Sequence, residues 1–290
     1  MTARGWLFGA DGRLHAAWRI LAFLVIASVA TLVLAQSVAF VAPQLLMSTS
    51  AAAVAVTGLI GLVGAGLAHL FMLAVVEKRG WRFVSLDRAA LNPRALTVGA
   101  FSGTLAILVP SLLLVGVSWF RFGPAGAGSS LKAAATLLLI LAPAAFSEEL
   151  LIRGYIFSVA RESWSTAAAV ASTSIVFGLL HGFNPGASAQ SLLVVMLAGA
   201  FLAFVLLATR SLYAAMLAHL AWNWTLAGVL HAAVSGLPFT VPDYELLDAG
   251  PDWATGGAWG PEGGLGAAIG LCGGIGYLYA RHRRRRESHA

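Results

Sequence analysis

Two adjacent glutamates, Glu148 and Glu149, stand inside a long apolar stretch of the 290-residue chain, and Arg153 lies four residues after the second. A carboxylate at membrane depth costs roughly 2.5 kcal/mol or more. On a helix, Glu149 and Arg153 share a face and can neutralise each other, whereas Glu148 points about 100° away. We therefore expect Glu149 and Arg153 to be structural and Glu148 to be available for proton transfer.

Histidine and asparagine recur at the same helical spacing further along the chain. Phe177 and His181 are four residues apart, and so are His219 and Asn223. N–H donors one helical turn apart, such as those of His219 and Asn223, can be aimed at a single oxyanion. With Glu148 as the group that activates water, these are the residue types that peptide hydrolysis needs.

The same side chains also permit a metal site. Glu148, His181 and His219 are suitable zinc ligands, and three protein ligands plus water is the pattern of catalytic zinc. The sequence contains no His-Glu-x-x-His motif. Its single cysteine, Cys272, excludes an internal disulfide and a cysteine-rich metal cluster. We therefore favour a site without a cofactor and keep zinc on these three residues as the alternative.

The elements that must position these groups are membrane helices. The chain is 59% hydrophobic and only 10% charged, against about 25% charged in a soluble domain. We expect one all-α integral membrane domain over residues 1–290, a polytopic bundle of about eight transmembrane helices. The apolar runs that are long enough, or nearly long enough, to cross a hydrocarbon core of about 30 Å lie at about 17–41, 50–76, 95–118, 133–160, 165–181, 188–208, 211–231 and 263–280.

The distribution of charge predicts an orientation in the membrane. If the N-terminus is cytoplasmic, fifteen of the 18 basic residues fall inside and only Arg121 and Lys132 fall outside. This is a positive-inside pattern with an even number of spans, and it places both termini in the cytoplasm. The arginine-rich segment 281–286 is expected to bind anionic lipid rather than nucleic acid. The acidic loop 232–262 either gates access of the substrate or is a disordered linker.

Depth along the helices indicates that the polar groups meet. Counted at about 1.5 Å per residue from one membrane side, Glu148 lies roughly 20 Å deep, His181 roughly 24 Å, His219 roughly 14 Å and Asn223 roughly 20 Å. These depths agree to within about 10 Å before any helix tilt is allowed. We therefore predict a single wet pocket inside the bilayer.

Other unusual residues of the spans are expected to serve packing. His69 and His231 are single histidines in apolar surroundings, and we expect both to be hydrogen-bonded inside the protein. Gly266, Gly270 and Gly274 recur at every fourth position, which permits close contact between helices. We expect that contact within one chain rather than between two copies.

The three polar patterns, taken in order, resemble a known family. They are similar to the marks of the CPBP family, the CAAX-processing and bacteriocin-processing intramembrane endopeptidases, also called the Abi family. The similar core covers roughly residues 130–231. In this sequence the patterns are Glu148-Glu149-x-x-x-Arg153, Phe177-x-x-x-His181 and His219-x-x-x-Asn223.

The resemblance implies hydrolysis of a membrane-associated peptide or protein, in a prokaryotic cell membrane. By the same resemblance, Glu148 is the general base that takes a proton from water, and His181 helps to hold that water. His219 and Asn223 then donate hydrogen bonds to the oxyanion of the tetrahedral intermediate. The family has been described both as metal-dependent and as glutamate-type.

Within this resemblance, Glu149 and Arg153 orient the site.

Two other classes of function remain as alternatives. An ion- or proton-coupled carrier also uses buried Glu, His and Arg residues, although we find no inverted repeat that would relate two halves of the chain. A non-catalytic immunity or maturation partner in the membrane could share the same fold. The substrate itself is not encoded in any motif of this sequence.

Overall fold

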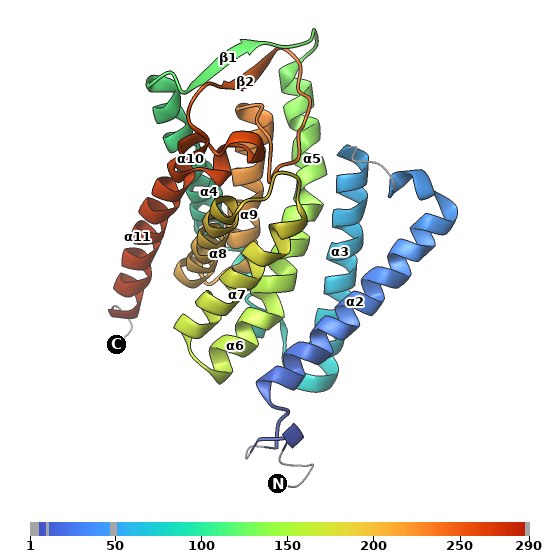
Figure 1. The fold of residues 1–290 in the computed structure, drawn as a ribbon. Helices are drawn as coiled ribbons and strands as arrows, with labels where there is room; N and C mark the ends of the chain where they lie inside the picture. The colour runs from blue at the N-terminus through green and yellow to red at the C-terminus, as the bar shows by residue number, and fades with distance from the viewer. Residues whose placement is uncertain (1–5, 10–11, 47–50, 288–290) are drawn as a thin grey trace.

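The computed structural model describes residues 6–9, 12–46 and 51–287 of the chain. Residue 50, the predicted start of the second span, lies outside these ranges. Long helices form most of the protein, and a small two-stranded antiparallel sheet lies at one end of the bundle (Figure 1). The sheet pairs β1 (Phe120–Pro124) with β2 (Tyr244–Asp248).

The helices follow the apolar runs of the sequence. The long α-helices are α2 (Ala16–Val41), α3 (Ala51–Phe71), α4 (Pro93–Gly116), α5 (Ser130–Glu149), α7 (Thr166–Leu180), α8 (Ala189–Thr209), α9 (Leu212–Trp224) and α11 (Leu265–Glu287). Short helices and helical turns are η1 (Pro43–Leu45), η3 (Trp81–Val84), η4 (Arg88–Leu91), α6 (Phe157–Ser163), η6 (His181–Phe183), α10 (Asp252–Thr255), η8 (Gly257–Trp259) and η9 (Pro261–Gly263). Three π-helical segments are η2 (Met72–Glu77), η5 (Leu150–Ile156) and η7 (Thr225–Val229).

The predicted fold class is nearly right, and the predicted number of spans is not confirmed. Each of the eight apolar runs coincides with a helix, and the sheet is the exception to an all-α fold. Within the described residues, however, only six helices are long and apolar enough to cross a membrane. The two that fall short are α9, whose 13 residues include His219 and Asn223, and α11, which ends in a run of arginines. The six are Ala16–Val41, Ala51–Glu77, Pro93–Gly116, Ser130–Ser163, Thr166–Phe183 and Ala189–Thr209.

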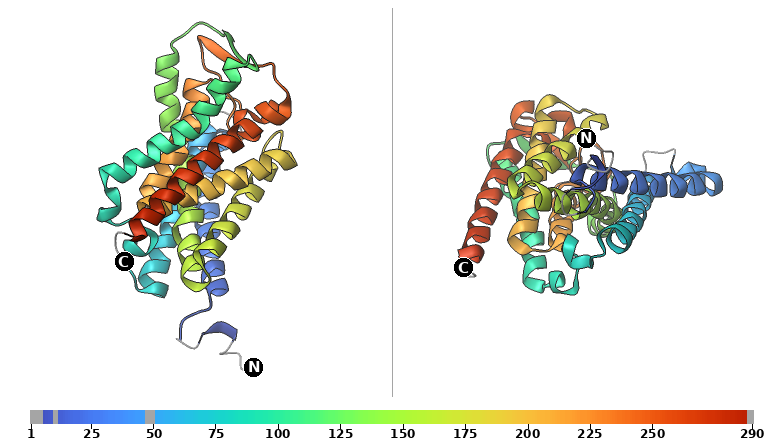
Figure 2. Two further views of the ribbon diagram at one scale, coloured as in Figure 1. Left: turned by 90° about the vertical axis from the view of Figure 1, so that its left-hand side faces the viewer. Right: turned by 90° about the horizontal axis from the view of Figure 1, so that it is seen from below.

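Helix α5 is the centre of the arrangement that positions the polar groups. It packs against α3 on one side and against α9 on another, while α4 packs along α9 and α7 packs along α8. Helix α2 packs along α3 and inclines away from the main body of the bundle (Figures 1 and 2). The polar motifs on α5, α7 and α9 are therefore held in the main body, beside the α2–α3 pair.

One end of α2 is fixed to the bundle by ion pairs. The buried Arg19 forms a bidentate pair with Glu77 of η2, at 2.8 Å for each bond, and reaches Glu162 of α6 at 3.0 Å. The Tyr155 hydroxyl donates to Glu77 at 2.5 Å. These bonds join α2, η2, η5 and α6 at the end of the bundle from which the chain starts.

The π-helical segment η5 explains one of the single histidines. The amide N–H of Tyr155 donates to Nε2 of His69 at 3.1 Å, and Nδ1 of the same ring lies 2.8 Å from the Ala65 carbonyl oxygen. A π-helical turn interrupts the regular ladder of backbone hydrogen bonds, so its amides can bond elsewhere. His69 is therefore an internal hydrogen-bonding residue that ties α3 to η5.

Glycines bring α4 into backbone contact with α9. A Cβ atom at Gly99 or Gly103 would overlap the carbonyl oxygen of Ala214 or Ala218. Because Ala218 precedes His219, this contact sets the depth and rotation of the histidine.

The glycine stripe of α11 makes a similar contact within the same chain. Gly266 and Gly270 lie against Leu114 and Ala106 of α4, while Gly274 lies against Phe201 of α8.

We predict that Gly103→Ala lowers the stability of the protein. The added methyl group has no space between α4 and α9, and overpacking of this kind typically costs about 1–3 kcal/mol. Thermal unfolding of the purified protein in detergent measures the loss. Gly66→Ala is the matched control, because no described atom lies within 4 Å of a Cβ at that helical position. Equal melting temperatures for the two variants would contradict the close contact.

Candidate functional site

The structure brings the three polar motifs together around Glu148. Nε2 of His181, at the end of α7, lies 3.8 Å from Oε2 of Glu148. Nε2 of His219, on α9, lies 3.9 Å from the same oxygen. The two imidazoles therefore approach one carboxylate oxygen from two different helices.

The neighbouring Glu149 has a different environment. Its side chain is 0% exposed, compared with 39% for Glu148. Oε1 of Glu149 accepts a hydrogen bond from Nη1 of Arg153 at 2.9 Å and lies 3.1 Å from Nδ1 of His219. The expected pairing of Glu149 with Arg153 is present, and His219 is a third member that the spacing did not indicate.

Arg153 links its ion pair with Glu149 to helix α8 and to Phe177 of the second motif. Its Nη2 donates to the Gly199 carbonyl oxygen of α8 at 3.1 Å, and its guanidinium carbon lies 4.0 Å from the centre of the Phe177 ring. The Phe177 ring also contacts both imidazoles, with centroid distances of 4.7 Å to His181 and 5.8 Å to His219. The phenylalanine of the second motif is thus an apolar support for the cation and both histidines.

Hydrogen bonds at the far side of each ring fix the tautomers. Nδ1 of His181 lies 2.8 Å from the carbonyl oxygen of Phe177, which can only accept, so this nitrogen carries the proton. Nδ1 of His219 faces the Glu149 carboxylate and carries a proton for the same reason. Each neutral ring therefore presents Nε2 toward Glu148 as an acceptor.

Three acceptors consequently face one gap. Oε2 of Glu148 is buried and has no hydrogen-bond partner among the described residues. The separations of 3.8 and 3.9 Å between acceptors are too long for a direct hydrogen bond and suit a bridging water molecule. Water is the natural occupant, because its two O–H groups can donate to two of the three acceptors.

Two cavities of different character are lined by the residues of this cluster. A small one of about 30 Å³ is lined by His181, His219 and Asn223, and its size suits one or two water molecules. A groove of about 960 Å³ is lined by Glu148 and by mostly apolar residues from α2, α3, η5, α6 and α7. Glu148 thus lines the apolar groove, and the two imidazoles near its carboxylate line the water-sized cavity.

Asn223 lies where the helical spacing placed it. It follows His219 by one turn on α9 and lines the small cavity together with both histidines. The adjacent Trp222 is buried, and its indole N–H donates to Oε2 of Glu262 at 2.7 Å. This bond fixes the helix turn that presents the asparagine amide.

Glu262 and Ser235 are site residues that the sequence did not indicate. Both line the small cavity. Glu262 is buried, and its Oε1 accepts hydrogen bonds from the backbone N–H and, at 2.7 Å, from the hydroxyl of Ser235. The bond between Trp222 and Glu262 joins residues 40 positions apart, and no local spacing signals such a contact.

The loop 232–262 is therefore not a disordered linker. It contains β2, α10 and η8, it buries Trp259, and Glu262 attaches it to α9 beside the cavity. His231, which precedes it, stacks on Tyr244 at a centroid distance of 3.7 Å and has Nδ1 2.6 Å from the Tyr244 carbonyl oxygen. That histidine is an internal hydrogen-bonding residue, as expected.

The residues do not fit a zinc ion as they are placed. Bonds of about 2.0–2.1 Å in a tetrahedral site put the donor atoms about 3.4 Å apart, whereas Oε2 of Glu148 lies 3.8 and 3.9 Å from Nε2 of His181 and His219. Within the described part of the chain, no group of three His, Cys, Asp or Glu side chains is arranged to hold a metal ion.

Comparison with known families agrees with the motifs. Residues 130–225 match the model of the family described as type II CAAX prenyl endopeptidase Rce1-like. This match confirms the resemblance to the CPBP family. The matched segment runs from the start of α5 to the start of η7, so it contains all three motifs. Searches of curated proteins and of solved structures found no match.

At family level, the Rce1-like match supports an intramembrane endopeptidase of CAAX type. The six long apolar helices indicate an integral membrane protein. Glu262 and Ser235 lie outside the Rce1-like segment, so this part of the site is not covered by the family match.

We predict that Arg153→Ala reduces the yield of folded protein. The change leaves Glu149 as a buried carboxylate without its guanidinium partner, and loss of one partner of a buried pair typically costs about 3–5 kcal/mol. Size-exclusion profiles and thermal unfolding in detergent measure the effect. The double variant Glu149→Gln/Arg153→Met removes both charges and should recover much of the loss. Normal accumulation of Arg153→Ala would show that the ion pair does not support the fold.

Proposed function

We propose that this protein is an intramembrane endopeptidase in which Glu148 activates water to hydrolyse a peptide bond of a membrane-associated substrate. The observation that carries the proposal is the unpartnered Oε2 of Glu148, which faces two imidazole nitrogens at 3.8 and 3.9 Å. The Rce1-like match of the segment that bears these residues supports the reaction class.

In the first step, Glu148 is the general base. A water molecule held between Glu148 and His181 donates its protons to acceptors and directs a lone pair toward the scissile carbonyl carbon. As the C–O bond forms, one water proton passes to Glu148. When the tetrahedral intermediate collapses and the C–N bond breaks, the same proton passes to the leaving amine.

His219 and Asn223 are the proposed oxyanion donors. Nδ1 of His219 already carries a proton against Glu149, so Nε2 can donate only when the ring holds a second proton. Two adjacent carboxylates, Glu148 and Glu149, favour that positive charge. The amide of Asn223 donates without any change of protonation. Each such donor accelerates acyl transfer by about 10²–10³-fold in other hydrolases.

The apolar groove is the proposed path of the substrate. It is lined by Glu148 and by apolar residues of the α2–α3 pair and of α6 and α7. A peptide with a hydrophobic or lipid-modified segment can place that segment in the groove and its scissile bond against Glu148. The partners we propose are thus a membrane-associated peptide or protein and the lipid bilayer, without nucleic acid.

The proposed orientation keeps both termini in the cytoplasm. Helix α2 begins and α11 ends away from the two-stranded sheet, while the acidic loop 232–262 lies toward the sheet (Figure 1). The positive-inside pattern of the sequence supports this arrangement in a prokaryotic cell membrane. An ion-coupled carrier and a non-catalytic maturation partner are less well supported, because the matched family consists of endopeptidases.

We predict that Glu148→Gln abolishes hydrolysis and leaves the fold intact. Glutamine has nearly the same shape but cannot accept a proton from water. The measurement is cleavage of a prenylated CAAX-type reporter peptide by the protein in proteoliposomes, with thermal unfolding recorded in parallel. Glu245→Gln, at an exposed position in β2, is the matched control and should cleave normally.

Unaltered cleavage by Glu148→Gln would remove this mechanism. Cleavage that is lost with a zinc chelator and restored by zinc would instead favour the metal alternative on Glu148, His181 and His219. Measurement of the zinc content of the purified active protein is a second, independent test of the metal alternative.

We predict that Asn223→Ala lowers kcat by about 10²–10³-fold with little change in KM, because the lost hydrogen bond acts on the transition state. The same proteoliposome assay measures both constants. Asn223→Ser restores a short O–H donor and should recover part of the loss. An increase in KM at unchanged kcat would assign Asn223 to substrate binding instead of oxyanion stabilisation.

A further inference from the structure

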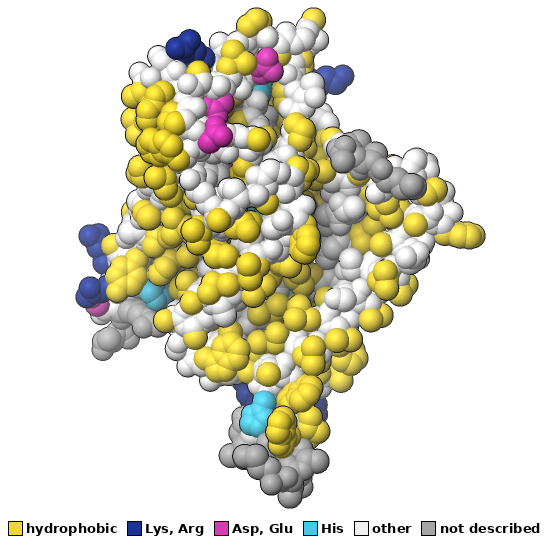
Figure 3. Space-filling view, viewed as in Figure 1, with side chains coloured by type: hydrophobic (Ala, Val, Ile, Leu, Met, Phe, Trp, Pro, Cys, Tyr) yellow, Lys and Arg dark blue, Asp and Glu magenta, His cyan; other side chains and the backbone are white. Residues whose placement is uncertain are grey.

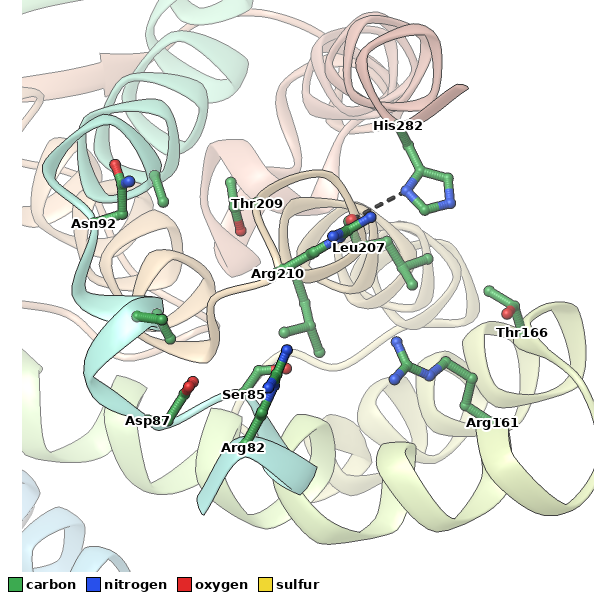
Figure 4. Close-up of a pocket in the computed structure, with 14 residues that line it drawn as sticks. Arg82, Ser85, Asp87, Asn92, Arg161, Thr166, Leu207, Thr209, Arg210 and His282 are labelled. Carbon is green, nitrogen blue, oxygen red and sulfur yellow. Dashed lines mark hydrogen bonds between the residues drawn. The ribbon is translucent and has the colours of Figure 1, made fainter. Parts of the chain in front are cut away.

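A separate polar cavity lies where several helices and their connecting turns meet (Figure 4). It has a volume of about 600 Å³ and shares no lining residue with the two cavities beside Glu148. Arg82 of η3, Arg161 of α6 and Arg210 of the turn after α8 extend into it from three sides. Segments far apart in sequence thus bring three guanidinium groups to one concave surface.

Few carboxylates among the described residues lie in this cavity. Asp87 is the one acidic residue among its described lining residues. Neither Arg82 nor Arg210 forms an ion pair with a described residue, whereas Arg19 and Arg79 pair with Glu77 and Glu162. The neighbouring carboxylates Glu77 and Glu162 thus pair with other arginines, and within the described part of the chain Arg82 and Arg210 keep their charge available to a ligand.

The position of the cavity indicates the depth in the membrane at which a ligand would bind. Thr209 is the last residue of one candidate membrane span and Thr166 is the first residue of another, and both line the cavity. The site therefore lies where membrane-spanning helices end, which is the depth of lipid head groups. Ser85 and Asn92 add neutral polar groups to its wall.

We propose that this cavity binds a phosphate group, and that its source is the head group of an anionic phospholipid. Arginine matches phosphate oxygens with paired N–H donors and loses less hydration than lysine on doing so. A volume of about 600 Å³ accommodates a single head group. The Asp87 carboxylate suits a head group that also carries hydroxyls, such as phosphatidylglycerol. This inference is independent of the proposed peptidase activity.

The test uses the full-length protein in nanodiscs of phosphatidylcholine, with or without phosphatidylglycerol. Native mass spectrometry measures the phosphatidylglycerol that the protein retains, and thermal unfolding measures its stabilisation. We expect Arg82→Gln/Arg210→Gln to bind phosphatidylglycerol about 30-fold more weakly than the unaltered protein, given about 1 kcal/mol for each of the two basic residues near an anionic surface.

The matched control is Arg88→Gln/Arg94→Gln. These exposed arginines belong to the same region of the chain but do not line the cavity, so retention of the lipid should be unchanged. If the glutamine pair at 82 and 210 does not fold, Arg82→Lys/Arg210→Lys keeps the charge, loses the paired donors and should bind with intermediate affinity.

A second arm separates the two sources of phosphate. Inorganic phosphate is compared with chloride at equal ionic strength in phosphatidylcholine nanodiscs. Stabilisation by inorganic phosphate that requires Arg82 and Arg210 would support a phosphate site filled from solution. Equal lipid retention by both variant pairs, together with no phosphate effect that depends on Arg82 and Arg210, would overturn the proposal.

Discussion

The buried carboxylate of Glu149 is the constraint on which the rest of the site depends. Its Oε1 is within hydrogen-bond distance of both Arg153 and His219, and Arg153 extends the network to Gly199 and the ring of Phe177. A buried ion pair adds little net stability compared with an apolar core, but removing one partner is severely destabilising. The pair therefore specifies how α5, α7, α8 and α9 fit together. The orientation of the His219 ring toward Glu148 follows from it.

The sequence predicted those parts of the site that depend on helical geometry. Four-residue spacing correctly paired Glu149 with Arg153, and depth along the helices correctly placed His181 and His219 beside Glu148. These inferences need only the rise and periodicity of a helix. Depth alone does not say which helices are neighbours, and the structure supplies that information.

Contacts between helices, and between helices and loops, could not be predicted from the sequence. The bond between Glu149 and His219 joins two motifs that the sequence treated as having separate roles, and the bond between Trp222 and Glu262 orders a loop that local composition made look flexible. The predicted number of eight spans is not confirmed for a related reason. Helix α9 carries the polar groups of the site and is too short and too polar to resemble an independent membrane span, because neighbouring helices rather than lipid cover most of it.

In the proposed mechanism, the fixed tautomer of His219 gives its Nε2 two successive roles. Before the attack the nitrogen is an acceptor, which helps to orient water beside Glu148. When the ring has taken up a second proton from the solvent, Nε2 is a donor, which is what an oxyanion requires. Glu149 makes this change possible, because it holds the proton on Nδ1 in both states and stabilises the imidazolium when it forms. The adjacent glutamates therefore have complementary functions in this mechanism: Glu148 carries the proton from water to the leaving amine, and Glu149 stabilises the protonated imidazole that donates to the oxyanion.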